Sequence, residues 1–397
     1  MFNQKKSRIT YGIIGVVIII VIVIGFWAID YFALFQKTPE QSSATPQLST
    51  ETTPPVLYDL ETVASNLFVP WSIVFTSESR MLVSERNGNI RIIENETLLQ
   101  QPLGQFTVSQ KSEEGLMGMA IDPEYATTRK IFACLASKTE NGLYNSVVSF
   151  TDEKNSINDI ETIINTIPAA QYHAGCRLLF LPDNTLLITT GDATNKNLAQ
   201  DLNSLAGKTL RINRDGSFPT DNPFPNSPVW SYGHRNSQGL AFDKKNNIIW
   251  SSEHGPSIID GPAGGDEINH IEKGKNYGWP IIHHTETKTG LESPILEFTP
   301  AIAPAGMLFY TGTTYPQFTN KLLVTALKGE GIYEITIDQK NPSVISGFIK
   351  NKEISVGRIR DIVQAPDGSI YFATSNQDGR GKKNNGDDKI IKLVPRQ

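Results

Sequence analysis

The sequence has little of what nucleic-acid-binding proteins and several common enzyme classes require. Its formal net charge is −5, and Lys5, Lys6 and Arg8 form a basic cluster close to the N-terminus. This charge balance argues against a nucleic-acid partner. The sequence also has no HExxH, no CxxC, no Walker loop and no GxSxG elbow. The signatures of zinc proteases, dithiol oxidoreductases, nucleotide hydrolases and serine hydrolases are therefore absent.

Cysteine is scarce, with only Cys134 and Cys176 in the chain. In an oxidising compartment the two could form a disulfide. Nothing in the sequence indicates that their positions are close in space. We therefore expect two buried, unpaired cysteines in strands rather than a bond between them.

One long apolar run lies near the N-terminus. Tyr11–Ile29 carries no charge and has a centre of isoleucine and valine, which is long enough to cross a bilayer as a helix. We predict a basic cytoplasmic tail over residues 1–10 and a transmembrane signal anchor over residues 11–31. A cleaved signal peptide is the alternative, but Phe26, Trp27 and Tyr31 occupy the region where small residues would be needed.

Residues 32–56 are rich in serine, threonine and proline and are predicted to form a disordered linker. The remaining domain, residues 57–397, would then lie outside the cytoplasm, held to the cell membrane by a single span.

Beyond the linker, the chain repeats one pattern of apolar strands separated by Pro-Asp-Gly-like turns, and no helical periodicity persists. Successive copies begin at intervals of roughly 45–65 residues, the range in which propeller blades repeat. The six copies begin near Trp71, Gly115, Arg177, Gln238, Ala303 and Arg360. We predict an all-β, six-bladed β-propeller over residues 57–397. In such a fold, loops from distant blades meet around the central channel.

Four motifs carry a resemblance to a known family: YGHRNSQGLAF (232–242), SSEHGP (251–256), GGDEINHIEKGKNYGWP (264–280) and RIRDIVQAPDG (358–368). Together they resemble the soluble aldose (glucose/sorbosone) dehydrogenases, six-bladed propellers that use pyrroloquinoline quinone (PQQ). The resemblance covers about residues 57–394. It implies oxidation of the anomeric C1 of aldose sugars to lactones by hydride transfer to PQQ. It also implies a later electron acceptor, which could be a quinone, a cytochrome or a dye.

The resemblance implies that His173 is the general base. Histidine suits this role because its ordinary pKa lies near the working pH. Asp192 would orient the imidazole and stabilise its cation, as the aspartate does in a hydrolase triad. A single histidine before a strand is more often structural, but the matching aspartate and the nearby Arg177 favour catalysis.

The same resemblance assigns PQQ binding to Arg235, Asn236, Lys328, Arg358 and Arg360, with Arg177 as a further candidate. Arginine and lysine suit a cofactor that carries three carboxylates. Lys328 lies between two apolar strands, which argues against an ordinary solvated lysine. The spacing of Arg358 and Arg360 places both on one face of a strand, and it does not distinguish an inward from an outward face.

Calcium is the second implied cofactor. The main-chain carbonyls of Gly255 and Pro256 are its implied ligands, and oxygen donors suit this ion. Asp266 and Glu267 could hold the loop or a second ion, or could form a solvated acidic turn.

Three residues depart from the family pattern. Cys176 stands where glycine is more usual, and Ala301 stands where the glucose enzyme has a hydroxyl residue that contacts PQQ. Glu113 stands where a glutamine contributes to the substrate pocket, so it is a candidate substrate residue that could change sugar preference. The loops that cover substrate and quinone in the glucose enzyme are reduced here, which indicates a broad-specificity aldose dehydrogenase.

Two other function classes remain open at this point, because a fold does not determine a function. The first is a non-catalytic propeller that binds a ligand or a protein, which the loss of His173, Lys328 or the arginine pair would have favoured. The second is a calcium-dependent propeller lactonase or esterase. It would need several carboxylate and asparagine ligands at the channel mouth, where this chain is rich in cations instead.

Overall fold

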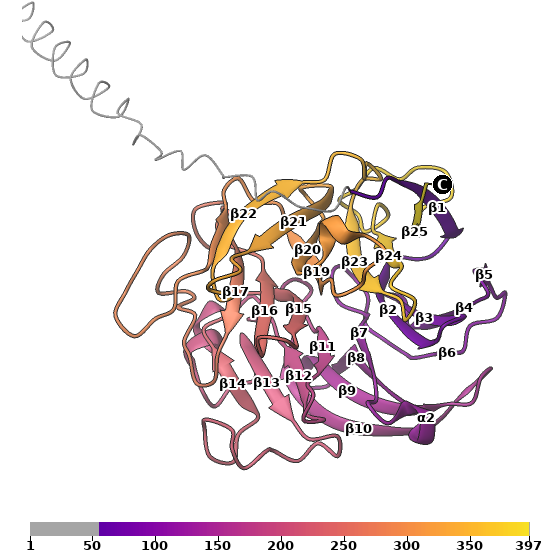
Figure 1. Ribbon diagram of the computed structural model, residues 1–397. Coiled ribbons are helices and arrows are strands. Elements are labelled where there is room, and N and C mark those ends of the chain that lie inside the picture. The colour runs from indigo at the N-terminus through magenta and orange to yellow at the C-terminus, as the bar shows by residue number, and fades with distance from the viewer. Residues whose placement is uncertain (1–54, 397) are drawn as a thin grey trace, which may run out of the picture. The chain divides into compact units, whose positions relative to one another are not determined.

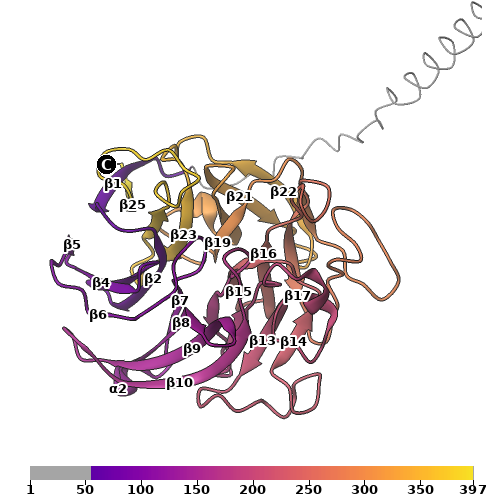
Figure 2. The same cartoon turned by 180° about the vertical axis from the view of Figure 1, so that it is seen from behind.

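The computed structural model describes residues 55–396. Its strands form six sheets arranged in a ring (Figures 1 and 2). The prediction of an all-β, six-bladed propeller is confirmed. The predicted tail, the predicted anchor over residues 11–31 and almost all of the predicted linker lie outside the described residues. Within residues 55–396, no helix is long and apolar enough to cross a membrane.

The strands of the first three blades are given from the innermost strand outward. Blade one has β2 (Pro70–Ser77), β3 (Arg80–Glu85), β4 (Asn89–Glu94) and β5 (Thr97–Leu98), with β6 (Gly104–Gln105) also paired to β4. Blade two has β7 (Leu116–Ile121), β8 (Lys130–Thr139), β9 (Gly142–Asp152) and β10 (Ile157–Pro168), with the short helix α2 (Tyr125–Thr128) between β7 and β8. Blade three has β11 (Leu178–Phe180), β12 (Leu186–Thr189), β13 (Lys208–Ile212) and β14 (Val229–Tyr232), with the 3₁₀ helix η1 (Lys196–Gln200) before β13.

The other three blades follow the same order. Blade four has β15 (Ser237–Asp243), β16 (Ile248–Glu253), β17 (Asp266–Ile271) and β18 (Leu296–Phe298). Blade five has β19 (Pro304–Phe309), β20 (Lys321–Ala326), β21 (Gly331–Ile337) and β22 (Ile345–Lys350), with the 3₁₀ helix η2 (Pro316–Phe318) before β20. Blade six has β23 (Ile359–Gln364), β24 (Ile370–Thr374), β25 (Ile390–Pro395) and, from the start of the domain, β1 (Tyr58–Ala64).

The innermost strands surround the central channel. Each of β2, β7, β11, β15, β19 and β23 packs against the innermost strand of the next blade. All six predicted repeat starts lie one residue from the first residue of one of these strands. The repeat was visible because each innermost strand is apolar and is followed by a turn.

Blade six closes the ring with strands from both ends of the domain. β1 pairs antiparallel with β25, with Tyr58 opposite Pro395. This pairing leaves no open edge between the first and last parts of the ring, which is how closed β architectures avoid unpaired edge strands.

The Pro-Asp turns have a clear structural reason. In blade three, Asn184 adopts a left-handed conformation and its N–H donates to the carbonyl of Leu181 at 2.9 Å. In blade six, Gly368 is also left-handed and donates to the carbonyl of Ala365 at 2.9 Å. Asparagine and glycine adopt this conformation more readily than other residues, so these turns end the innermost strands at defined points.

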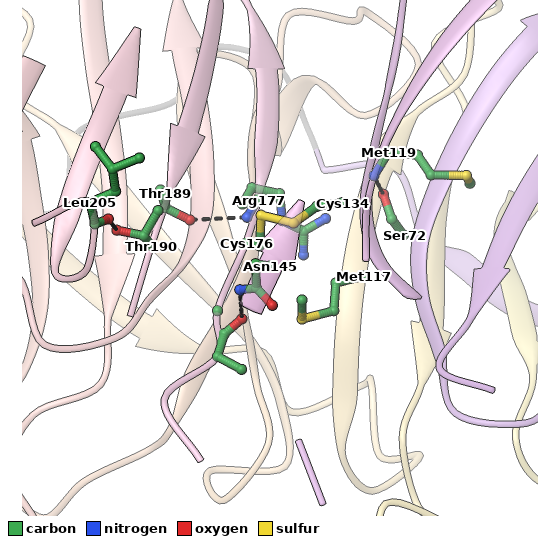
Figure 3. Close-up of a disulfide and its surroundings, with 12 residues drawn as sticks. Ser72, Met117, Met119, Cys134, Asn145, Cys176, Arg177, Thr189, Thr190 and Leu205 are labelled. Carbon is green, nitrogen blue, oxygen red and sulfur yellow. Dashed lines mark hydrogen bonds between the residues drawn. A yellow bond between two sulfur atoms is a disulfide. The ribbon is translucent and has the colours of Figure 1, made fainter. Parts of the chain in front are cut away.

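The expectation of two unpaired strand cysteines is wrong. Cys134 of β8 and Cys176, which lies just before β11, form a disulfide with 6.2 Å between their Cα atoms (Figure 3). Both residues are fully buried. The bond joins blade two to the segment that leads into blade three. The sequence could not show this, because the two positions are brought together by the packing of neighbouring blades.

Candidate active site

A histidine–aspartate pair lies at the end of the channel where the innermost strands begin. We name this end the site end. His173 lies between β10 and β11, and Asp192 follows β12. The Nδ1 atom of His173 is 2.7 Å from Oδ1 of Asp192. The imidazole is partly exposed, whereas Asp192 is buried. The structure thus brings together the two residues predicted to act as base and orienting carboxylate.

Both members of the pair are held in place by their surroundings. Asp192 accepts a bond from Nε1 of Trp279 at 2.9 Å and another from the backbone N–H of Thr194 at 2.8 Å. The His173 backbone is left-handed (φ 53°), and a Cβ on Gly191 would lie 1.9 Å from the His173 carbonyl oxygen. Only glycine at position 191 therefore allows this close approach.

A pocket of about 300 Å³ opens beside this pair. Its walls come from blades one, two, four, five and six and from the loop after β24. The lining residues are Arg86, Ser112, Glu113, Gln238, His254, Ala303, Leu327, Lys328, Arg358, Arg360, Asp378 and Arg380. Five of these carry a positive charge and two a negative charge. Since His254 is buried and lies near Arg235, its pKa falls well below the usual value and it adds no charge.

Arg358 and Arg360, both predicted as cofactor residues, share one counter-ion. Arg358 donates to Asp378 from Nε at 3.0 Å and from Nη2 at 2.6 Å, while Nη2 of Arg360 is 3.9 Å from the same carboxylate. Burial opposes the charged form of Asp378, but the two guanidinium groups outweigh it and lower its pKa. Burial lowers the pKa of Arg360 to about 10, so the guanidinium stays charged at neutral pH. Its Nε atom is buried and has no hydrogen-bond partner among the described residues.

Lys328 lies in the turn between β20 and β21. Its side chain is exposed and lines the pocket. The apolar strands on either side are buried, but the lysine in the turn between them is exposed, so these strands do not keep it from solvent as the sequence suggested.

Arg235 and Asn236 lie next to the pocket but are not among its lining residues. Nε of Arg235 donates to Asp260 at 2.8 Å, and its guanidinium carbon lies 5.5 Å from the ring centre of Trp279. Asn236 accepts the backbone N–H of Gly175 at 3.0 Å, while its Nδ2 is buried without a partner within the described part of the chain. Both residues brace the loops that carry His173 and Asp192.

Arg177 lies deeper in the channel than the other predicted cofactor residues. It pairs with Asp361 at 2.9 Å and does not line this pocket. Although it lies near Arg360, with which it shares contacts to Trp71 and Gln238, it does not join the cations that line the pocket.

Glu113 lines the pocket and connects two of its sides. One carboxylate oxygen accepts the backbone N–H of His173 at 3.1 Å, and the other lies 2.9 Å from Nη2 of Arg380. The carboxylate is therefore paired, and it faces the place where a substrate would meet the base.

The segment around Gly255 and Pro256 is packed closely against the next loop. A Cβ on Gly255 would lie 2.2 Å from the Gly264 carbonyl oxygen and 2.1 Å from that of Gly265. The carbonyls of Gly264 and Gly265 therefore lie directly against Gly255, and the Pro256 carbonyl, one of the two predicted calcium ligands, accepts the backbone N–H of Gly264 at 3.3 Å. Among residues 55–396, no group of three or more His, Cys, Asp or Glu side chains could hold a metal ion.

The two neighbouring acidic residues have other roles. Asp266 holds the loop together, because it accepts backbone N–H bonds from Gly255 at 2.8 Å, Ile302 at 2.7 Å and Ala303 at 2.6 Å. Burial and the nearby Glu253 raise the pKa of Glu267 well above its usual value.

Sequence reasoning missed Arg86, Arg380, Asp378 and Trp279. Arg86 follows β3 directly. Trp279 lies within the NYGWP motif, and this position in a recognised motif could have identified Trp279 as a site residue. Asp378 and Arg380 lie in a Gly-rich loop after β24. Nothing in a single sequence shows that this loop returns to the pocket.

Comparisons with known proteins agree with this geometry. Residues 67–385 match the Glucose / Sorbosone dehydrogenase family. The chain is 30% identical to an aldose sugar dehydrogenase of Escherichia coli over 86% of this chain and 94% of the relative. The PQQ-bound aldose sugar dehydrogenase of Streptomyces coelicolor superposes with a TM-score of 0.75 at 32% identity, covering 87% of this chain and all of that one. The apo form of the soluble E. coli aldose sugar dehydrogenase superposes with the same TM-score at 30% identity, covering 86% and 100%.

Proposed function

The chain belongs to the glucose/sorbosone dehydrogenase family, and from this premise we propose that it oxidises the anomeric carbon of aldose sugars to lactones with PQQ as hydride acceptor. The observation that carries this proposal is the cation-rich pocket beside the His173–Asp192 pair. Five cations and two carboxylates give the pocket a net charge of +3 (5 − 2), which matches the three carboxylates of PQQ. No surplus positive charge is left for an acidic sugar, so we expect a neutral aldose.

The residues of the pocket fit PQQ chemically. Arg86, Lys328, Arg358, Arg360 and Arg380 would hold its carboxylates, since all five line the pocket. Bound PQQ would supply the quinone that takes the hydride from C1.

His173 would take the proton of the anomeric hydroxyl. Because Nδ1 faces the Asp192 carboxylate at 2.7 Å, the proton of the neutral imidazole is on Nδ1 and the Nε2 lone pair is available as the base. Asp192 would then stabilise the imidazolium, and Trp279 would keep the carboxylate in position. Glu113, which holds the His173 backbone, would face the sugar hydroxyls and influence which aldose fits.

The proposal includes calcium, bound by the main-chain carbonyls of Gly255 and Pro256. The family resemblance supports this assignment, and main-chain carbonyls are oxygen donors of the kind that suit calcium.

We also propose that the domain works outside the cytoplasm, tethered by the apolar segment 11–31. The Cys134–Cys176 disulfide supports this location, because such bonds persist in oxidising compartments.

The direct test is to load the full chain with PQQ and Ca²⁺ and to follow dye reduction across a panel of aldoses. Sugar-dependent reduction that needs PQQ and is lost with EDTA is the expected result. Cofactor binding with no turnover on any aldose would favour a sensor, and failure to bind PQQ would favour the binding-module alternative.

A further inference from the structure

A second pocket, of about 430 Å³, lies at the other end of the central channel. Strand β23 runs from one pocket to the other. Arg360, near the start of β23, lines the pocket beside His173, which we name the site-end pocket, whereas Ile362, Val363 and Gln364 line the second pocket. The later residues of the other five innermost strands line it as well. We name it the far-end pocket.

Apolar side chains from all six innermost strands surround the mouth of the far-end pocket. Those that are only partly buried are Val74, Ile121, Leu179, Phe180, Phe242, Leu308 and Val363. Among residues 55–396, the only charged residues that line the pocket are Arg177 and Asp361, which neutralise each other at 2.9 Å. An uncovered apolar hollow of this kind is typical of a binding site, and its lack of net charge favours a neutral, apolar ligand.

The guanidinium group of Arg177 lies at the inner end of this pocket. Arg177 is 6% exposed; its Nε donates to the carbonyl of Gln238 at 2.9 Å and its Nη1 to Asp361. Its third nitrogen, Nη2, has no partner among the described residues. A buried donor without an acceptor is costly, so a ligand that brings a carbonyl oxygen would be favoured here.

The ring of Trp71 contacts one arginine from each pocket. The guanidinium carbon of Arg177 lies 4.3 Å from the ring centre of Trp71, and that of Arg360 lies 5.8 Å from the same ring. Gln238 also connects the two arginines, since its side-chain oxygen accepts from Arg360 and its backbone carbonyl accepts from Arg177. The cofactor cations and the far-end pocket are thus linked through Trp71 and Gln238.

The described chain starts at the same end of the channel. The backbone N–H of Val56 donates to the side chain of Gln317 at 3.1 Å, and Gln317 returns a bond to the Val56 carbonyl at 2.9 Å. Gln317 lies in η2, which follows β19, and the last residue of β19, Phe309, lines the far-end pocket. The described part of the chain therefore begins on the face of the propeller that carries this pocket.

We propose that the far-end pocket binds a lipid-soluble quinone, the electron acceptor of this protein. The quinone ring would lie within the apolar ring of side chains, with one carbonyl oxygen toward Arg177. This inference rests on the proposed function: two electrons leave the aldose and convert the quinone to the quinol, which takes two protons from solvent, while the aldose loses two hydrogens to become the lactone.

The test maps quinone binding without any turnover. The full-length chain, with no PQQ and no sugar, is irradiated with a short-tailed azidoquinone, and labelled peptides are identified by mass spectrometry. We expect label at the ends of β11, β15 and β19, and at least a tenfold loss of label in Val74→Asp, which places a charge in the apolar mouth. Ile349→Asp is the matched control, since Ile349 is 61% exposed on the outermost strand β22 and should label as the parent does.

Label on the site-end pocket, label equal in Val74→Asp and Ile349→Asp, or no label would each overturn the inference. A second measurement uses the PQQ-loaded protein and compares reduction of a short-tailed quinone with reduction of a soluble dye. The quinone-to-dye ratio should fall at least tenfold in Val74→Asp and in Leu308→Asp, and an unchanged ratio would contradict the site. If no aldose supports dye reduction but the far-end label persists, the proposed function fails while the quinone site stands.

Discussion

The Cys134–Cys176 disulfide should contribute a large, measurable part of the stability of the propeller. The bond links residues 42 apart in the sequence, and cross-linking a loop of that length lowers the entropy of the unfolded chain by an amount worth about 4 kcal/mol at 25 °C. For a domain of this size, that corresponds to a melting temperature lower by about 5 °C once the bond is absent.

The assay is guanidinium unfolding of the oxidised and the fully reduced protein, followed by fluorescence. Reduction should lower the free energy of unfolding by about 4 kcal/mol. A Cys134→Ala/Cys176→Ala variant is the control, and its midpoint should not respond to reductant. Equal midpoints for the oxidised and reduced parent would refute the reasoning, and would show that the bond does not restrict the unfolded chain.

Three further predictions follow from the site and its surroundings. Trp279→Phe removes the N–H that holds Asp192, so kcat should fall about tenfold with PQQ affinity unchanged; an unchanged kcat would remove Trp279 from the positioning role. Lys328→Ala combined with Arg360→Ala should weaken PQQ binding without unfolding the propeller, as measured by titration of the cofactor absorbance, and unaltered affinity would contradict the cofactor assignment. Burial raises the pKa of the Asp388 carboxyl from 3.8 to about 6. Because the folded protein binds the Asp388 proton more tightly than the unfolded chain does, protonated Asp388 stabilises the fold at low pH, and this stabilisation is lost as the pH rises from about 4 through 6. Asp388→Asn should remove that loss, and its free energy of unfolding relative to the parent should rise by on the order of 3 kcal/mol between pH 4 and pH 7; a pH-independent difference would contradict the assignment.

The fold could be predicted from the sequence because the propeller repeats a local pattern. Each innermost strand is an apolar run that ends in a turn such as Pro182-Asp183-Asn184, and local patterns of this kind are visible without tertiary information. The disulfide could not be predicted, because it depends on how blade two packs against the segment before β11.

Part of the site could also be predicted, because some of its residues lie in motifs that are visible in the sequence. His173 and Asp192 stand in recognisable motifs, and the structure places them in hydrogen-bond contact. Arg177 stands in a similar motif, yet its guanidinium pairs with Asp361 of blade six across the channel, a contact between distant parts of the chain that a single sequence does not show. Asp378 neutralises two predicted cofactor arginines, and this pairing between separate loops leaves no trace in a single sequence.

The central claim is that His173 is the base of a sugar dehydrogenase. The most direct measurement is PQQ-dependent dye reduction by the parent chain and by His173→Ala, on the aldose that the parent oxidises fastest, with PQQ affinity measured in parallel. The account predicts a rate lower by about 10²–10⁴-fold in the variant with cofactor binding intact. A variant that keeps the parent's rate, or a parent that oxidises no aldose while binding PQQ, would contradict it.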